Sequence, residues 1–207
     1  MARASVKGIF FDFDGVLTTE ASGSRFTCRS LAGLSGIPYE HLFREYSIYN
    51  EDLLRGKLTH EGVLPLLSES LGREIGPGLL HEAFIDTPID GKMAALAARL
   101  KRRGCKIGMI TDNKKDRIDA IMEFHGWDGL FGAVAISAVV GGRKDEPEIF
   151  EYALKAINLR ADECAFIDNS EKNLTVPAKM GFETIFFDDK KRDHAALDKI
   201  LAQLLAM

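Results

Sequence analysis

The chain has 207 residues, of which 46% are hydrophobic and 28% are charged, and its formal net charge is -4 at pH 7. This length and composition suit one globular domain, with or without an insertion, and the slightly acidic balance argues against nucleic acid as a partner. The apolar run near the N-terminus is too short for a signal peptide, and no later run reaches the length of a membrane span. We therefore expect a soluble, cytoplasmic protein that does not bind a membrane.

Short apolar runs alternate along the chain with helix-like segments, which is typical of an α/β fold whose central parallel sheet is covered on both faces. Strands are predicted at Val6–Phe13, Lys106–Thr111, Ala133–Ser137, Cys164–Asp168 and Glu183–Phe187. Helices are predicted over Gly91–Arg103, Lys114–His125, a segment capped by Asp145 with Pro147 in its first turn, Glu171–Met180 with a late start or kink at Pro177, and Asp193–Ala206. The pattern predicts three layers.

The interval from Thr18 to about Pro88 differs, because it has helical patterns and no convincing strand. Its helices are predicted at Tyr39–Asn50, Thr59–Leu71 and Gly78–Ile85. We therefore divide the chain into an α/β core of residues 1–17 and 88–207 and a small α-helical domain of residues 18–87.

Cysteine and histidine show no metal-ligand spacing. The three cysteines are far apart and odd in number, so free thiols are expected at Cys28, Cys105 and Cys164. The five histidines are interpreted as surface or helix-end residues. Several cations of the helical interval could reach a substrate, although such side chains are usually solvated: Arg25, Arg29, Arg55, Lys57 and His60.

Two aspartates follow the first apolar run in FFDFDGVLTTE, directly before Gly15. Side chains at i and i+2 of a strand point the same way, so Asp12 and Asp14 can face one pocket. Two adjacent carboxylates are costly unless a metal or a shared proton neutralises them. Because the helical interval begins just after this pair, we expect it to lie over the site.

More polar residues follow the other predicted strands. Thr111 ends the second strand in ITDN, where the amides of Asp112 and Asn113 could meet an anion at the start of a helix. Lys144 precedes a helix in GGRKDEPEIF, and Asp168 ends the fourth strand in FIDNSEKN. In an open parallel sheet the carboxyl ends of the strands form the usual ligand site.

FDFDGV, ITDN, the lysine of GRKDEPEIF and FIDN, in this order, resemble the four motifs of the haloacid dehalogenase superfamily. The resemblance covers the whole sheet-forming part of the chain. It implies a Rossmann-like core, and it implies that the helical interval is a cap domain inserted after the first motif.

The resemblance also implies roles. Asp12 would attack a phosphoryl group to form an aspartyl-phosphate, and Asp14 would be the general acid and base. Mg²⁺ would be held by the carboxylates of Asp12 and Asp168 and the main-chain oxygen of Asp14. Thr111 and the Asp112 amide would bind phosphoryl oxygens, and Lys144 would offset the negative charge.

The resulting hypothesis is a Mg²⁺-dependent phosphatase acting on a small phosphorylated metabolite. A dehalogenase is disfavoured because Asp14 is present, and a phosphomutase because TTEASGSR after the first motif contains no histidine. Phosphomutase or phosphotransferase activity and a catalytically idle, ligand-binding member remain as alternatives. Asp145 stands where the family usually has a proline after the third-motif lysine, so either Lys144 or Arg143 could point into the site. In the fourth motif, Asn169 and Asn173 stand at the positions where family members often have a second acidic residue. The pattern predicts neither the substrate nor the oligomeric state.

Overall fold

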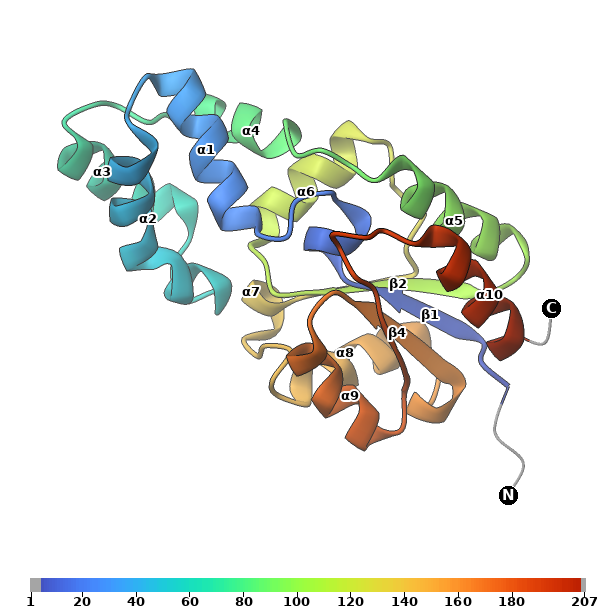
Figure 1. Cartoon of the computed structure of the whole chain (residues 1–207). Helices are drawn as coiled ribbons and strands as arrows, with labels where there is room; N and C mark the ends of the chain where they lie inside the picture. Colours follow the sequence, from blue (N-terminus) through green and yellow to red (C-terminus); the bar gives the residue numbers. More distant parts are fainter. Residues whose placement is uncertain (1–4, 206–207) are drawn as a thin grey trace.

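A computed structural model describes residues 5–205 as a five-stranded parallel sheet between two layers of helices, with further helices beyond one edge (Figure 1). The strands lie in the order β3-β2-β1-β4-β5, and every pairing is parallel. Their bounds are β1 Gly8–Phe11, β2 Lys106–Thr111, β3 Ala133–Ile136, β4 Cys164–Asp168 and β5 Glu183–Phe186. The predicted three-layer, Rossmann-like α/β fold is confirmed.

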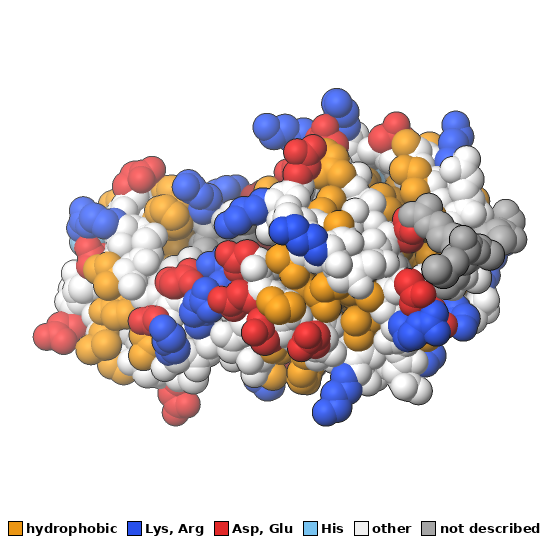
Figure 2. Space-filling model, turned by 90° about the horizontal axis from the view of Figure 1, so that it is seen from below, with side chains coloured by type: hydrophobic (Ala, Val, Ile, Leu, Met, Phe, Trp, Pro, Cys, Tyr) orange, Lys and Arg blue, Asp and Glu red, His pale blue; other side chains and the backbone are white. Residues whose placement is uncertain are grey.

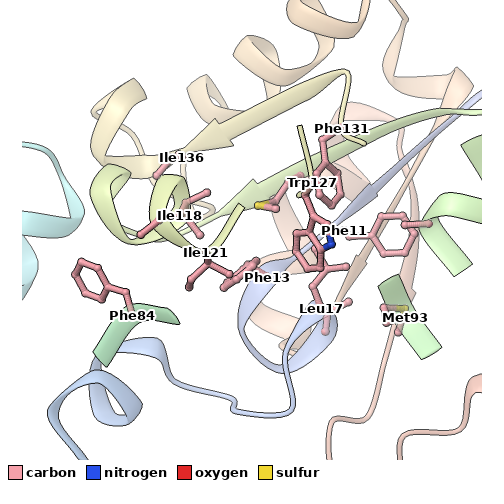
Figure 3. Close-up of a cluster of buried hydrophobic side chains, with 14 of the residues drawn as sticks. Phe11, Phe13, Leu17, Phe84, Met93, Ile118, Ile121, Trp127, Phe131 and Ile136 are labelled. Carbon is pink, nitrogen blue, oxygen red and sulfur yellow. The ribbon is translucent and has the colours of Figure 1, made fainter. Parts of the chain in front are cut away.

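The first strand lies in the middle of the sheet because both of its faces are apolar. Ile9 and Phe11 belong to one buried cluster, and Phe10 between them belongs to the cluster on the opposite face. Successive side chains of a strand point to opposite faces, so an unbroken apolar run is buried on both sides. Figure 3 shows the first cluster, where Phe11 and Phe13 pack with Trp127.

Helices cover the two faces in the predicted chain order. The first cluster takes side chains from α5, α6 and α10, with bounds Gly91–Arg102, Lys115–Phe124 and His194–Leu204. The second takes them from α8 (Glu148–Ile157) and lies against α9 (Thr175–Met180). The carboxylate of Asp90 accepts the amides of Lys92 and Met93 and so caps α5, while cations fill its last turn. Short elements complete the sheet connections: α7 Ser137–Val140, η2 Ala161–Glu163 and η3 Glu171–Leu174.

Several predicted boundaries change. The first strand ends at Phe11 and not Phe13, since the chain turns at Asp12 into the single turn η1 (Phe13–Leu17). Asp145 does not cap α8, because Pro147 is the N-cap residue and the exposed Asp145 carboxylate lies 3.6 Å from Lys172. The expected break near Pro177 is present, as the segment divides into η3 and α9. The predicted helix end at Ala206 lies outside the described residues.

Helices α1 to α4 fill the chain between η1 and α5 (Figure 1). Their bounds are α1 Gly23–Ser35, α2 Tyr39–Leu54, α3 His60–Leu71 and α4 Pro77–Ile85. The first of them was not predicted, because Gly, Ser and Thr weaken its helix propensity. It packs on α2 and α4, and its buried Cys28 and Leu31 belong to the first cluster. Phe84 of α4 lies near Ile118 and Ile121 of α6 in the same cluster (Figure 3).

The chain enters and leaves this helical segment at one place. Thr18 forms an antiparallel bridge with Ile89, and the amide of Thr19 donates to the carbonyl of Pro88 over 3.0 Å. The segment of helices α1, α2, α3 and α4 is therefore joined to the sheet by two chain segments that lie side by side. Within residues 5–205, no helix combines the length and the hydropathy needed to span a membrane. All three cysteines are free thiols, as predicted.

Candidate active site

A cavity of about 510 Å³ lies at the carboxyl ends of β1 and β2, between the sheet and helices α1 and α2. Residues of the two helices line it together with five predicted site residues: Asp12, Asp14, Thr111, Asp112 and Lys144. The sixth predicted residue, Asp168, is buried behind the lining. Figure 2 shows acidic and basic side chains intermixed at the junction between the helical segment and the rest of the molecule. Two ion pairs cross this junction, Arg55 to Glu146 at 3.2 Å and Arg143 to Glu51 at 2.7 Å. The cavity is therefore enclosed by charged contacts between α2 and the loop before α8.

Asp12 directly follows β1 and lines the cavity. Its Oδ1 accepts hydrogen bonds from the Phe13 amide at 2.7 Å and from Lys144 Nζ at 2.8 Å. No described residue donates a hydrogen bond to Oδ2. Burial raises the pKa of Asp12 well above its usual value, although Lys144 acts in the opposite direction. The free Oδ2 is the atom that a nucleophilic carboxylate would use.

Lys144 bridges two buried carboxylates. Its Nζ lies 2.8 Å from Asp12 Oδ1 and 2.7 Å from Asp168 Oδ2. Burial opposes the charge of Lys144, but the two aspartates outweigh it, and the pKa of this lysine lies above its usual value. Arg143 instead contacts Asp112 and Glu51. Both candidates of the third motif line the cavity, and Lys144 is the one that contacts Asp12 and Asp168.

Asp168 is completely buried at the end of β4. Its carboxylate accepts the Ser170 amide at 2.7 Å and the Asn173 side-chain amide at 3.1 and 3.2 Å, besides the lysine. Asn173 therefore serves as a donor to Asp168. The side chain of Asn169 lies against Gly15, where an added Cβ would come within 2.2 Å of its Nδ2. Gly15 also has a φ of 84°, so this turn requires glycine.

Asp14 is held by an arginine that was not predicted. Arg117 of α6, only 1% exposed, donates from Nη2 to Asp14 Oδ1 at 2.9 Å and from Nη1 to Oδ2 at 3.0 Å. Asn113 Nδ2 donates to Oδ2 at 2.9 Å. Gly23 permits the pair, since a Cβ there would lie 2.3 Å from Arg117 Nη1. The one sequence signal for Arg117 is its place on the buried face of α6, next to Ile118.

The second motif is arranged differently from the prediction. Thr111 is buried at the end of β2, lines the cavity and accepts a hydrogen bond from Asn113 Nδ2 at 3.3 Å. The Asn113 amide, expected to meet an anion, donates instead to Ser137 Oγ at 3.0 Å. The helix starts only at Lys115, so this amide does not belong to its first turn. The Asp112 carboxylate accepts the Lys144 amide at 3.0 Å and orders the loop that carries this lysine.

The turn that carries Asp14 is fixed from behind by the chain before α10. Arg192 donates to the main-chain oxygens of Gly15 and Val16, each over 3.0 Å, and pairs with Asp90. Arg192 adopts a φ of 47°, a conformation that is uncommon outside glycine. No local pattern in the sequence predicted this contact.

Of the five cations predicted to approach a substrate from the helical segment, Arg25 lines the cavity. The others contact protein partners: Arg29 pairs with Glu20, Arg55 with Glu51 and Glu146, Lys57 with Asp52, and His60 with Tyr46 and Asp116. His60 is buried and begins α3, so it fits the helix-end half of the interpretation given to the histidines. The cavity is also lined by residues that the prediction missed, among them Ser24, Phe43, Asn50 and Lys114.

The arrangement at Asp12 and Asp168 fits a cation. Two carboxylate oxygens converge on the single ammonium of Lys144, and oxygen is the ligand that Mg²⁺ prefers. Residues 5–205 contain no group of three or more His, Cys, Asp or Glu side chains suited to a metal. Because Asp14 turns its carboxylate to Arg117, it could contribute its main-chain oxygen. Such a sparse protein set suits Mg²⁺, which keeps several waters.

The parallel sheet, with carboxylates and a lysine gathered at its carboxyl edge, defines the class as a Rossmann-like α/β protein. The sequence model of the haloacid dehalogenase-like hydrolases matches residues 6–181, and the chain belongs to this family.

Two relatives by sequence and one solved structure are similar over most of the chain. Bifunctional epoxide hydrolase 2 of Rattus norvegicus is 26% identical over 92% of this chain, which spans only 38% of that protein's length. Pyrimidine 5'-nucleotidase YjjG of Escherichia coli is 31% identical, over 71% of this chain and 69% of its own. A HAD family enzyme from Bacteroides thetaiotaomicron, solved with magnesium and inorganic phosphate, has a TM-score of 0.76 at 17% identity, covering 93% of this chain and 98% of its own.

Proposed function

We propose that this hydrolase is a Mg²⁺-dependent phosphatase that cleaves a small phosphorylated metabolite through an aspartyl-phosphate on Asp12. The observation that carries the proposal is the geometry of Asp12, which lines the cavity and whose Oδ1 is fixed by Lys144 and the Phe13 amide, while Oδ2 accepts no hydrogen bond from the described residues. A carboxylate held in this way can attack an electrophile without reorganising.

Each step uses groups of this chain. Asp12 Oδ2 attacks phosphorus and the bond from phosphorus to the leaving oxygen breaks. Asp14, protonated and released from Arg117 when the substrate is bound, gives its proton to that oxygen. Asp14 then accepts a proton from water, the water oxygen attacks phosphorus, and the bond to Asp12 breaks to release inorganic phosphate. Thr111, the Asp112 amide and Lys144 bind the phosphoryl oxygens. Mg²⁺, held by Asp12, Asp168 and the main-chain oxygen of Asp14, would neutralise phosphoryl charge.

The substrate is proposed to be small because α1 and α2 cover the cavity. Relatives named as phosphatases or nucleotidases support phosphate ester hydrolysis, since a glyceraldehyde 3-phosphate phosphatase of Pyrococcus furiosus and the Escherichia coli nucleotidase are both similar to this chain. Three free thiols suit a reducing compartment, so the proposal includes a cytoplasmic location.

The test is release of inorganic phosphate from a panel of phosphate esters, measured with Mg²⁺ and with EDTA. The panel contains sugar phosphates, nucleotides, phosphate esters of small hydroxy acids, and p-nitrophenyl phosphate. We expect release that requires Mg²⁺ and disappears in Asp12→Asn. The matched control is Asp145→Asn, because this exposed aspartate borders Lys144 in sequence and lies outside the cavity lining. Phosphate that stays on an organic product would instead favour a mutase or transferase. Turnover by Asp12→Asn at the normal rate would contradict the mechanism.

A further inference from the structure

The basic side chains that line the cavity fall into two groups, beside the acidic Asp12, Asp14, Glu51 and Asp112. Lys144 and Arg143 each form ion pairs with aspartate or glutamate. Lys114 and Arg25 also line the cavity, and neither forms an ion pair with a carboxylate among residues 5–205. The second group is therefore available to a charged ligand.

Lys114 belongs to a different wall of the cavity from Lys144. Its Nζ donates to Ser24 Oγ of α1 at 2.6 Å and to Asn50 Oδ1 of α2 at 2.7 Å, while the ammonium of Lys144 contacts residues at the ends of β1 and β4. The Nζ also lies 5.5 Å from the centre of the Tyr46 ring. The two lysines thus define two cationic positions, one at the reacting aspartate and one toward the helices.

The environment of Lys114 is unfavourable for an isolated charge. The residue is only 3% exposed, and its two hydrogen-bond partners are neutral. Burial, with a smaller contribution from Arg117, lowers the pKa of Lys114 to about 7. An ammonium has three donors and gains most from an anionic acceptor when it is shielded from water. A ligand anion at this position would supply the missing counter-charge.

Arg25 extends the cationic surface to the cavity mouth. It lies in the first turn of α1, beside Ser24, and its guanidinium stacks over the Phe43 ring at 4.9 Å. This stacking leaves the edge of the guanidinium, where its donors lie, available to an anion. Arg25 is exposed, so its charge persists without a protein partner.

We propose that the substrate carries a second anionic group, a carboxylate or a second phosphate, on the part that leaves, and that Lys114 binds this group with Arg25 at the mouth. This inference rests on the proposed phosphatase function and narrows its substrate class. Lys144 takes the phosphoryl group at one end of the substrate, and Lys114 takes the second anion at the other. The spacing of the two anions then determines which ester is cleaved.

The experiment compares kcat/KM for pairs of esters that differ in the second charge. The carboxylate pairs are 2-phosphoglycolate with 2-hydroxyethyl phosphate, and 3-phosphoglycerate with glycerol 3-phosphate. The bisphosphate pair is fructose 1,6-bisphosphate with fructose 6-phosphate, and p-nitrophenyl phosphate reports phosphatase activity as such. We expect the wild type to prefer the doubly anionic member of at least one pair by about tenfold or more. Which pair shows the preference distinguishes a carboxylate from a second phosphate.

Two variants then test the assignment. Lys114→Met should reduce the preference ratio by about tenfold, and Arg25→Gln by about threefold, because each removes a charge-assisted contact. The matched control is Lys115→Met, since this neighbouring lysine is exposed and pairs with Asp119 on its own helix. The control should keep the wild-type ratio.

The outcomes separate the two proposals. Metal-dependent release from p-nitrophenyl phosphate with no preference in any pair overturns the second-anion site and leaves the phosphatase intact. A preference that survives in both Lys114→Met and Arg25→Gln also overturns it. If Lys114→Met does not fold by circular dichroism, the exposed Arg25→Gln decides the assignment. Absence of release from every ester refutes the phosphatase, and the site inference with it.

Discussion

Replacing Arg117 with methionine removes the charged partner of Asp14 from the interior. The guanidinium is 1% exposed and the Asp14 side chain 14% exposed, and two hydrogen bonds of 2.9 and 3.0 Å join them. Loss of one partner of a buried pair costs about 3–5 kcal/mol, because the other charge stays behind without compensation. Asp14 keeps its hydrogen bond from Asn113 and also lines the cavity. We therefore expect a loss of unfolding free energy near the lower end of this range.

The expected effect is a decrease of about 3 kcal/mol in the free energy of unfolding. For a chain of 207 residues this corresponds to a melting temperature lower by about 6–12 °C. The measurement is urea denaturation without Mg²⁺, followed by circular dichroism. The matched control is Arg160→Met, since Arg160 binds Asp162 in the same two-point geometry at 2.9 and 2.8 Å but with side chains 70% and 52% exposed. Solvent screens that pair, so no measurable change is expected.

A double-mutant cycle with Asp14→Asn isolates the interaction from other losses. Arg117 also donates to Asn113 and Thr87, and these contacts are lost in both arms of the cycle. We expect a coupling free energy of about 2 kcal/mol between Arg117 and Asp14. Two results would refute the conclusion that this ion pair stabilises the site. In one, the changes in the free energy of unfolding caused by Arg117→Met and Asp14→Asn are additive. In the other, Arg117→Met lowers the free energy of unfolding no more than Arg160→Met does.

Two further predictions concern pH. Lys144→Met leaves Asp12 and Asp168 as neighbouring buried carboxylates without their shared cation. Because burial already raises the pKa of Asp12 above its unfolded value, the free energy of unfolding of this variant should fall as pH rises from 4 to 7. Urea denaturation of the metal-free variant at both pH values checks this prediction. The pKa of Lys114 is about 7 in the folded protein, below its ordinary value of 10.5. Burial of its charge therefore lowers the free energy of unfolding fully below pH 7, and this loss disappears as pH rises from 7 to 10.5. Lys114→Met should therefore stabilise the protein at pH 6, with a smaller gain at pH 9; an equal gain at both would contradict the burial of its charge.

Local sequence patterns were sufficient to predict the sheet, the helices that cover it and the protein family. Strand periodicity and helix-forming runs depend on residues close in sequence, so all five strands and most helices were predicted within a few residues. Parallel connection brings the carboxyl ends of strands to one edge, so the sequence alone was enough to group Asp12, Thr111, Lys144 and Asp168. Helix α1 was missed since its Gly, Ser and Thr residues form a helix only when packed against α2 and α4.

Contacts between distant elements were decided by the tertiary structure. The partner of Asp14 lies 103 positions away on α6, and Lys114 meets Ser24 and Asn50 from two other helices. A lysine or arginine looks the same in sequence whether it is solvated or buried, because its burial and its counter-charge depend on which elements pack around it. The sequence by itself therefore determined the order of the elements and the edge of the sheet at which the charged residues gather, while packing decided which of these charges are paired within the protein.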